Sequence, residues 1–303
     1  MANFTDITIL LDRSGSMESI KTAMESGFDE FLQQHKAIPT TRISLIQFDG
    51  INSYDEVYIE RPITEAPGLN LRPRGWTPLL DAMCKTIDKV GQRLAAKREA
   101  DRPDKVLFLV ITDGEENASR EFKREDVRKR VTLQTEGYKW QFVYLGANQD
   151  AFKEAASFGI KLGQTICFSA ASAGTQNAWR SLATNTASYA SNPNENATLD
   201  SYTQSQRDEA MEDNTTTTVT LHRLTADPYA EDPYKFPRSE EGQRYLAFRG
   251  ARIIKDPFKA GFEVSFTKAA PTCPSCGLLR GESTPSSGCA PGSHYWKNSG
   301  ASY

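Results

Sequence analysis

The sequence predicts an α/β fold in which a doubly wound, mainly parallel β-sheet carries helices on both faces. Short apolar runs rich in Val, Ile, Leu and Phe recur along residues 1–190, and segments with apolar residues at helical spacing lie between them. Continuous apolar runs are typical of strands that are buried on both faces of a parallel sheet. Because neighbouring parallel strands need a crossover, which is usually a helix, this alternation places helices on both faces of the sheet.

The strands are expected where apolar and β-branched residues run together between turn signals. The predicted strands are Ile7–Leu11, Arg42–Phe48, Glu56–Glu60, Lys105–Thr112, Trp140–Leu145 and Thr165–Phe168. The third of these is short and alternating, which suits an edge strand. Asp49-Gly50 separates the second strand from the third, and Asp49 is interpreted as a solvated turn residue, with a side-on approach to the site described below as the alternative.

The helices are expected where apolar residues recur three and four positions apart. The clearest case is the apolar series Leu79, Met83, Ile87, Val90 and Leu94. The other predicted helices are Glu18–Lys36, Arg120–Glu136, Asp150–Phe158 and Thr175–Tyr189. The charges along Arg120–Glu136 indicate a solvated helix face.

Oxygen-bearing side chains follow the first buried strand at alternate positions. Asp12, Ser14 and Ser16 alternate along a short turn, so that three oxygens can converge on one point. Thr77 precedes Pro78, a residue well suited to the first position of a helix, and Asp113 ends a second buried strand. Ligands bind at the carboxyl ends of the strands in open α/β sheets, and Mg²⁺ prefers oxygen ligands at about 2.0–2.1 Å. The alternative is that the first three residues serve only as turn formers and a helix N-cap.

Together these residues resemble the metal-ion-dependent adhesion site of von Willebrand factor type A domains. That family carries Asp-x-Ser-x-Ser after its first strand, a threonine in a later loop and an aspartate at the end of its fourth strand; the matching residues are Asp12, Ser14, Ser16, Thr77 and Asp113. The resemblance covers about residues 1–190 and implies a Rossmann-like sheet of six strands with one antiparallel edge. Uncharacterised bacterial and phage members are similar to the chain in three segments, Asp12–Met17, Thr112–Ser119 and Leu145–Asp150.

The resemblance implies a site that binds and does not catalyse. In the family the serine and threonine oxygens coordinate Mg²⁺ or Mn²⁺, and one position stays open for a partner's Glu or Asp carboxylate. The expected function is therefore that of a metal-dependent protein-interaction module, not an enzyme, within a multiprotein assembly. Some intracellular relatives act beside AAA+ ATPases, and this chain has no Gly-x4-Gly-Lys phosphate-binding loop of its own.

A Mg²⁺-dependent hydrolase or phosphatase with Asp12 as nucleophile is the alternative function. Two features weigh against it. Ser14 stands where phosphatases of the haloacid dehalogenase type carry a second acidic group, and His35, His222 and His294 lie outside the three loops.

The part of the chain after residue 190 is expected to form an appendage to this domain. Residues 191–240 are polar and predict a linker or a disordered region. Residues 241–270 suggest a small β segment made from Tyr245–Phe248, Ala251–Ile254 and Phe262–Phe266. In the tail, residues 271–303, four residues have the spacing of a Cys₃His zinc knuckle: Cys273, Cys276, Cys289 and His294. A disordered tail with chance cysteines is the alternative.

Composition excludes some classes of partner. The formal net charge of −3 over 303 residues gives no general electrostatic attraction to nucleic acid, and the tail from Cys273 onward has only two basic side chains, Arg280 and Lys297. Nucleic-acid binding through a zinc-bearing tail is therefore a third, weaker hypothesis. No apolar run approaches the roughly 18 residues of a membrane helix, and Asp6 interrupts any secretory signal pattern, so a cytoplasmic location is expected.

Overall fold

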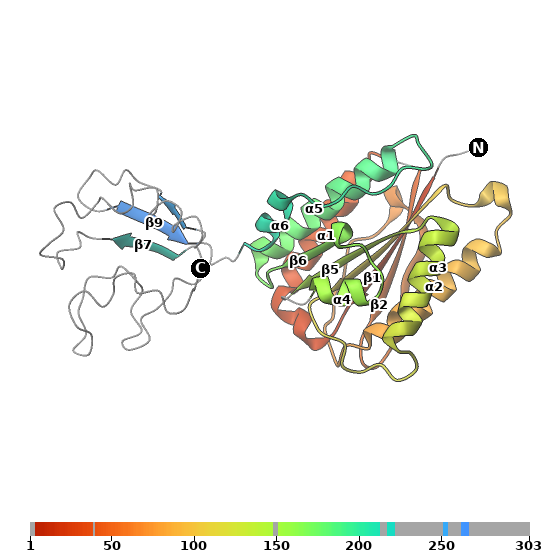
Figure 1. Cartoon of the computed structure of the whole chain (residues 1–303), viewed down its shortest axis with the longest axis horizontal. Helices are drawn as coiled ribbons and strands as arrows, with labels where there is room; N and C mark the ends of the chain where they lie inside the picture. Colours follow the sequence, from red (N-terminus) through yellow and green to blue (C-terminus); the bar gives the residue numbers. More distant parts are fainter. Residues whose placement is uncertain are drawn as a thin grey trace, which may run out of the picture. The chain divides into compact units, whose positions relative to one another are not determined.

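The chain forms two compact units, Met1–Glu212 and Asp213–Tyr303 (Figure 1). The computed structural model describes residues 4–38, 40–147 and 151–212, and beyond these the backbone of three short strands. Each unit is described by itself.

The first unit is built on a six-stranded sheet with the order β3-β2-β1-β4-β5-β6. Its strands are β1 (Thr5–Asp12), β2 (Thr41–Phe48), β3 (Asp55–Pro62), β4 (Lys105–Thr112), β5 (Gln141–Ala147) and β6 (Thr165–Phe168). Neighbouring strands are parallel except for β3, which pairs antiparallel with β2 at the edge. The predicted fold class is confirmed, including the edge position of the third strand.

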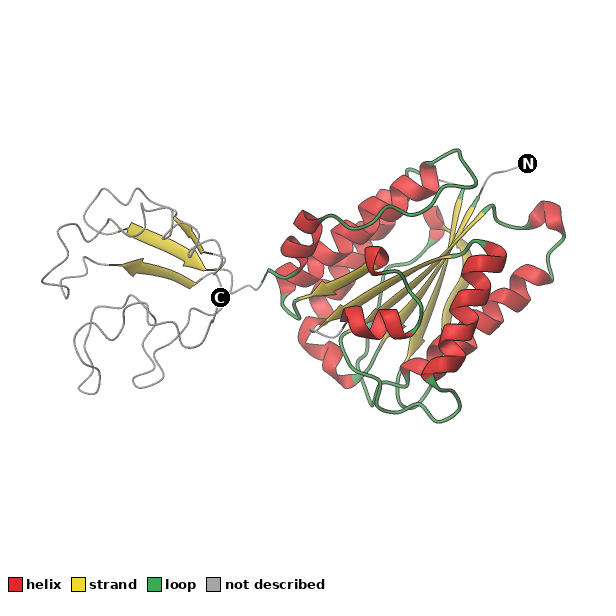
Figure 2. Ribbon diagram, in the orientation of Figure 1, coloured by secondary structure: helices red, strands yellow, loops and turns green. Residues whose placement is uncertain are grey.

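Helices cover both faces of this sheet (Figure 2). They are α1 (Lys21–His35), α2 (Leu79–Ala95), α3 (Arg124–Tyr138), α4 (Ala151–Ser157), α5 (Ser172–Ser191) and α6 (Gln204–Ala210), with short 3₁₀ helices at Gly15–Ile20, Ile63–Glu65, Glu99–Asp101 and Leu162–Gln164. Successive side chains of a strand point to opposite faces. Ile7, Ile9 and Leu11 of β1 therefore pack in the core with α1 and α5, whereas Leu10 packs in the core with α2, α3 and α4.

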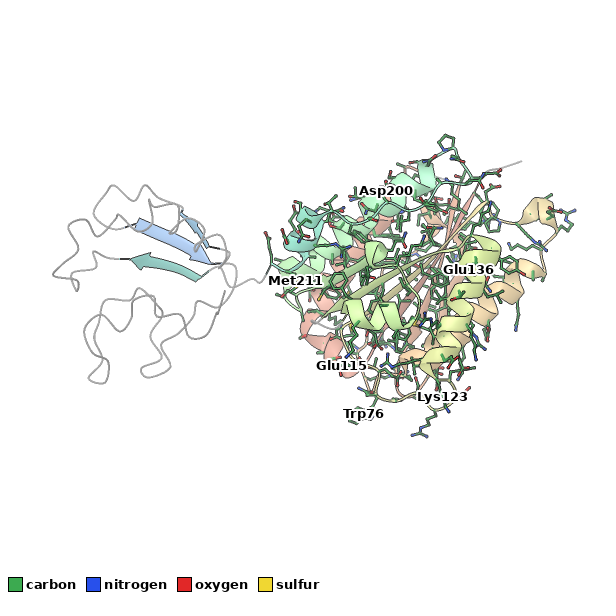
Figure 3. All side chains as sticks on the ribbon, viewed as in Figure 1. Trp76, Glu115, Lys123, Glu136, Asp200 and Met211 are labelled. Carbon is green, nitrogen blue, oxygen red and sulfur yellow. The ribbon has the colours of Figure 1, made fainter. Side chains whose placement is uncertain are left out.

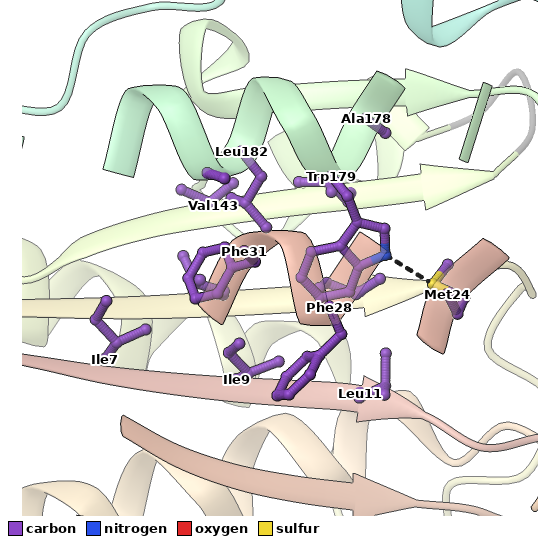
Figure 4. Close-up of a cluster of buried hydrophobic side chains, with 14 of the residues drawn as sticks. Ile7, Ile9, Leu11, Met24, Phe28, Phe31, Val143, Ala178, Trp179 and Leu182 are labelled. Carbon is purple, nitrogen blue, oxygen red and sulfur yellow. Dashed lines mark hydrogen bonds between the residues drawn. The ribbon is translucent and has the colours of Figure 1, made fainter. Parts of the chain in front are cut away.

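Helices α1 and α5 pack against each other in the core that contains Ile7, Ile9 and Leu11 (Figure 4). A Cβ atom added to Gly27 would lie 2.4 Å from Cδ1 of Trp179 and 2.8 Å from its Cβ, so that only glycine fits at this position. The indole Nε1 of Trp179 donates to the sulfur of Met24 at 3.1 Å, and the Trp179 and Phe28 rings pack edge to face. This contact fixes α1, and with it the loop that precedes α1, against the sheet.

Two helices begin later than the apolar pattern predicts. The turn after β1 first forms the 3₁₀ helix Gly15–Ile20, and α1 starts only at Lys21. Helix α3 starts at Arg124 and not at Arg120, because the carboxylate of Asp81 accepts the backbone N–H groups of residues 120–122 at 2.9–3.0 Å. These amides are satisfied outside a helix, and the chain is held in a loop up to residue 123.

The boundary predicted at residue 190 lies inside the first unit. Helix α5 continues to Ser191, and the chain then returns through Leu199 and Tyr202 to α6, which packs on α5 and β6. Leu199, Tyr202 and Ala210 are buried, so residues 191–212 are part of the domain and not a linker. The linker was predicted because most residues of this stretch are polar, but these three apolar residues are buried against the domain.

The described part of the second unit is a three-stranded antiparallel sheet with the order β7-β9-β8. Its strands are β7 (Thr217–Leu221), β8 (Ala251–Ile253) and β9 (Phe262–Phe266). Strand β7 comes from the segment predicted as a linker, and the strand predicted at Tyr245–Phe248 lies outside the described residues. Among the helices that the structure describes, none is long and apolar enough to cross a membrane.

Candidate metal centre

The candidate site lies where the direction of the strand order reverses. Strand β1 lies between β2 and β4 and is parallel to both, with Leu11 opposite Ile111 of β4. Asp12 is the last residue of β1 and Thr112 the last of β4, so their loops open at the same carboxyl edge. In open α/β sheets such a reversal leaves a crevice between the two loops in which ligands bind.

The structure brings the five residues of the predicted metal site together. The Ser16 hydroxyl donates to Oδ1 of Asp113 at 2.7 Å and lies 3.1 Å from the Ser14 hydroxyl. The remaining two residues, Thr77 and Asp12, lie near Gly114. A Cβ atom added to Gly114 would lie 3.1 Å from Thr77 Oγ1, 3.6 Å from Ser16 Oγ and 3.9 Å from Asp12 Oδ2. Oxygens from three loops therefore surround one small space that glycine leaves open.

The turn itself argues against a purely capping role. Ser14 stands at the N-cap of the 3₁₀ helix Gly15–Ile20, yet its side chain makes no capping hydrogen bond. Its backbone N–H donates to Asp12 Oδ1 at 2.7 Å, which closes the turn and leaves both serine hydroxyls on the side of Asp113. The turn is thus stabilised by the aspartate, and the serine hydroxyls are available for another ligand.

Thr77 is fixed in place by the loop that follows β4. Its backbone N–H donates to Oδ1 of Asn117 at 2.9 Å, and the Asn117 N–H donates back to the Thr77 carbonyl at 3.1 Å. On the other side, the Gly15 N–H donates to the Gly75 carbonyl at 3.1 Å. These bonds join the three loops of the site through their backbones.

Glu116 and Asp81 hold the same loop to the start of α2. One carboxylate oxygen of Glu116 accepts the N–H of Leu80 at 2.9 Å, and the other accepts the N–H groups of Ala118 and Ser119. This network gives a role to further members of the segment Thr112–Ser119, in which the sequence had assigned a role to Asp113 alone. Thr112 belongs to the site as well, since its hydroxyl donates to Asp12 Oδ2 at 2.6 Å.

Arg13 and Asp49 form a buried ion pair beside the site, which sequence reasoning missed. Oδ2 of Asp49 accepts from Nε and Nη2 of Arg13 at 2.9 and 2.6 Å and from Nε of Arg74 at 2.9 Å. Its Oδ1 accepts the N–H groups of Ile51 and Asn52. Asp49 is fully buried, so its interpretation as a solvated turn residue is wrong, and its partners are arginines and amides. It connects the loop after β1 to the loop before Thr77.

The site is electrostatically suited to a cation. Burial raises the pKa of Asp12 to about 7, against the hydrogen bonds from Thr112 and Ser14 that favour its ionised form. Burial also raises the pKa of Asp113, against the hydrogen bond from Ser16. The partners of Asp12 are neutral groups, while the nearby Arg13 guanidinium binds Asp49 and Asp55. A bound cation would favour the ionised carboxylates.

The donor set fits a hard cation. Its ligand atoms are three hydroxyl and two carboxylate groups, the kind of oxygen donors that Mg²⁺ and Mn²⁺ take. Within residues 4–38, 40–147 and 151–212, no group of three or more His, Cys, Asp and Glu side chains is placed to hold a metal ion. The predicted zinc ligands Cys273, Cys276, Cys289 and His294 lie outside the described residues.

Comparison with solved structures finds similar folds at low identity. They include proximal thread matrix protein 1 from the mussel byssus (12% identity, TM-score 0.47, 60% of this chain and 48% of that one) and a von Willebrand factor type A protein from Catenulispora acidiphila (12%, 0.43, 61% and 43%). The vWF domain of the pilus tip protein Mfa5 from Porphyromonas gingivalis matches over 64% of this chain and 98% of that one, at 9% identity and a TM-score of 0.40.

The chain spans about half the length of the first two structures. No protein-family model and no curated protein matches the sequence. At identities of 9–12% the similarity concerns the fold alone.

Proposed function

We propose that the chain is a protein-interaction module that binds Mg²⁺ or Mn²⁺ through Asp12, Ser14, Ser16, Thr77 and Asp113 and, through the metal, an acidic residue of a partner protein. The observation that supports the proposal is the convergence of these oxygens from three loops on the space beside Gly114, at the point where the strand order reverses. Bound metal would supply one coordination position for a partner carboxylate.

The roles of the side chains favour binding over catalysis. Ser14, Ser16 and Thr77 would be neutral ligands, so only Asp12 and Asp113 would place protein charge against a divalent cation. Neutral ligands leave the cation more attractive to a partner carboxylate than additional carboxylates would. Asp12 is fully buried. A buried carboxylate can help to hold a small cation, whereas a nucleophilic carboxylate must reach the reacting atom of a substrate, so the hydrolase alternative is disfavoured.

Three further proposals rest on the sequence alone. They are a place in a multiprotein assembly, for which the resemblance suggests an AAA+ ATPase, a cytoplasmic location, and a zinc site at Cys273, Cys276, Cys289 and His294.

Metal binding is tested by calorimetric titration of the full chain with Mg²⁺ and with Mn²⁺. Ser16→Ala removes one ligand from an exposed position and is expected to lower the affinity at least about tenfold, a loss of about 1.4 kcal/mol. Ser188→Ala, at an exposed position of α5, is the matched control and is expected to bind as the wild type does. Equal affinity of both variants, or no binding by the wild type, would refute the proposed site.

Partner binding is tested by affinity capture from a lysate of the source cells, with Mg²⁺ or with EDTA. Proteins that are retained by the wild type in Mg²⁺, and lost with EDTA or with Ser16→Ala, are the expected outcome. An Asp12→Ala variant repeats the test, with its folding checked by circular dichroism because Asp12 also closes the turn. Capture that is indifferent to both metal and Ser16 would contradict a metal-mediated contact.

A further inference from the structure

Two large apolar side chains are exposed next to the candidate metal centre. Trp76 is 69% exposed and Ile51 is 75% exposed, and Trp76 directly precedes Thr77. Most apolar side chains of this size are buried in the first unit. Tryptophan is one of the residues enriched among those that contribute most to binding at the centre of protein–protein contacts. We call Trp76 and Ile51 together the apolar rim.

The two residues of the apolar rim belong to loops that touch. A Cβ atom added to Gly50, the residue before Ile51, would lie 2.7 Å from the backbone N of Trp76 and 3.2 Å from its Cδ1. A Cβ on Gly75 would in turn lie 3.3 Å from the Gly50 N. The indole ring of Trp76 therefore lies against Gly50, the residue that precedes Ile51.

The backbone on both sides of Trp76 is fixed. Gly75 has a φ of +69°, in the left-handed region that favours glycine, and its carbonyl accepts the N–H of Gly15. On the other side, Thr77 exchanges two hydrogen bonds with Asn117. A rigid, exposed aromatic side chain loses little conformational entropy when a partner covers it.

The apolar rim is continuous with the metal centre. The Cα atoms of Trp76 and Thr77 are about 3.8 Å apart, and Thr77 Oγ1 faces the space beside Gly114. Consecutive residues of an extended peptide advance by about 3.3 Å, so a residue one or two positions from a metal-bound carboxylate reaches the rim. Glu115, also exposed, lies at the same end of the molecule as Trp76 (Figure 3).

We propose that the apolar rim selects the partner. The bound segment is an extended peptide that contains an Asp or Glu and, within about two positions on either side of it, an aliphatic, aromatic or proline residue. The side chain of that residue packs on Trp76 and Ile51. The inference rests on the proposed function, because the acidic residue is the one that the metal would hold. It adds the chemistry by which one acidic partner is distinguished from another.

The test is selection from two libraries of short random peptides displayed on phage, one with a central Asp and the other with a central Asn. Immobilised wild-type protein in Mg²⁺ is expected to enrich Asp peptides that carry an apolar residue within two positions of the Asp. Trp76→Ser and Ile51→Ser are expected to retain the Mg²⁺-dependent preference for Asp over Asn and to lose the apolar preference. Tyr138→Ser, 65% exposed at the end of α3, is the matched control and is expected to select as the wild type does.

One enriched peptide is then synthesised for fluorescence anisotropy. Trp76→Ser is expected to weaken its binding at least about tenfold, which corresponds to about 1.4 kcal/mol, and Tyr138→Ser to leave it unchanged within about twofold.

The outcomes separate this inference from the proposed function. Mg²⁺-dependent enrichment of Asp peptides with no apolar preference, or with one that survives Trp76→Ser, overturns the inference and leaves the metal site standing. No Mg²⁺-dependent preference for Asp over Asn overturns both. Self-association of the wild type that Trp76→Ser abolishes, measured by sedimentation equilibrium, assigns the rim to a second copy of the chain and also overturns the inference.

Discussion

Replacing Asp49 by Asn tests whether the buried ion pair positions the metal loops. The change keeps the shape of the side chain but removes its charge. The guanidinium groups of Arg13 and Arg74 then face either the amide N–H₂ or the neutral amide oxygen of the new side chain. In the wild type, burial alone would raise the pKa of Asp49, but the hydrogen bonds from Arg74, from the Asn52 and Ile51 amides and from Arg13 outweigh burial and hold that pKa below its ordinary value. The carboxylate is therefore ionised at neutral pH.

The expected loss of stability follows from the exposure of the partners. The Arg13 side chain is 10% exposed, so removing its buried counter-charge belongs to the class of broken buried pairs that cost about 3–5 kcal/mol. Arg13 keeps its contacts with Gln47 and Asp55, which offset part of this, and we expect about 2–3 kcal/mol. Arg74 is 49% exposed, so Arg74→Met is expected to cost less than about 1 kcal/mol.

Urea unfolding of the full chain, followed by far-ultraviolet circular dichroism, measures both variants. Asp49→Asn is expected to lower the free energy of unfolding by at least twice as much as Arg74→Met. The Mg²⁺ affinity of folded Asp49→Asn is also expected to fall, since Arg13 lies between Asp12 and Ser14, two of the proposed ligands. A loss of less than about 1 kcal/mol for Asp49→Asn, or equal losses for the two variants, would show that the ion pair does not position these loops.

Four further variants test other parts of the structure. Gly114→Ala places a Cβ atom within 4 Å of three of the site oxygens and is expected to lower Mg²⁺ affinity at least about tenfold with little change in stability; unchanged affinity in calorimetry would contradict the site. Gly27→Ala drives a Cβ atom into Trp179 and is expected to cost about 1–3 kcal/mol in urea unfolding, despite the better helix propensity of alanine; equal or higher stability would refute the crossing. Burial lowers the pKa of His35 to about 4, although its hydrogen bond to the Phe31 carbonyl offsets part of this effect. Between about pH 6.5 and pH 4 the His35 side chain is therefore protonated in the unfolded chain and neutral in the folded one. The free energy of unfolding is expected to fall by about 3 kcal/mol as the pH drops through this range. His35→Gln removes that part of the pH dependence, and identical pH profiles of unfolding would contradict it. Elemental analysis is expected to find about one zinc per chain, lost in Cys276→Ser, whereas zinc-free wild type with freely titratable thiols would leave no zinc site.

The strands of the first sheet and most residues of the candidate site could be predicted because their signals are local. Burial on both faces of the sheet requires continuous apolar runs, so β1 and β4 are visible in the sequence within one or two residues of their bounds. Each run ends in an aspartate or a threonine, and parallel strands bring such ends to one edge. Thr77 was predicted from its place before Pro78 together with the resemblance to von Willebrand factor type A domains, and its hydroxyl lies beside the other residues of the candidate site.

Contacts between segments far apart in the chain left no such signal. The α6 region is polar in composition, yet Leu199, Tyr202 and Ala210 are enough to hold it on the sheet. Helix α3 begins late because Asp81, about 40 residues earlier in the chain, binds the amides that precede it. A periodicity in one segment cannot reveal a hydrogen bond supplied by another.

By itself, the sequence determined the six strands of the first sheet, five of the helices that cover it and the oxygens at its carboxyl edge, because apolar periodicity and strand ends are properties of short segments. Only the tertiary structure decided that Asp49 is buried and paired with Arg13, that Thr112 supports Asp12, and that Trp76 stays exposed beside the metal centre. Those outcomes depend on which loops meet. A charged or aromatic residue in a loop has no fixed burial until its neighbours in space are known.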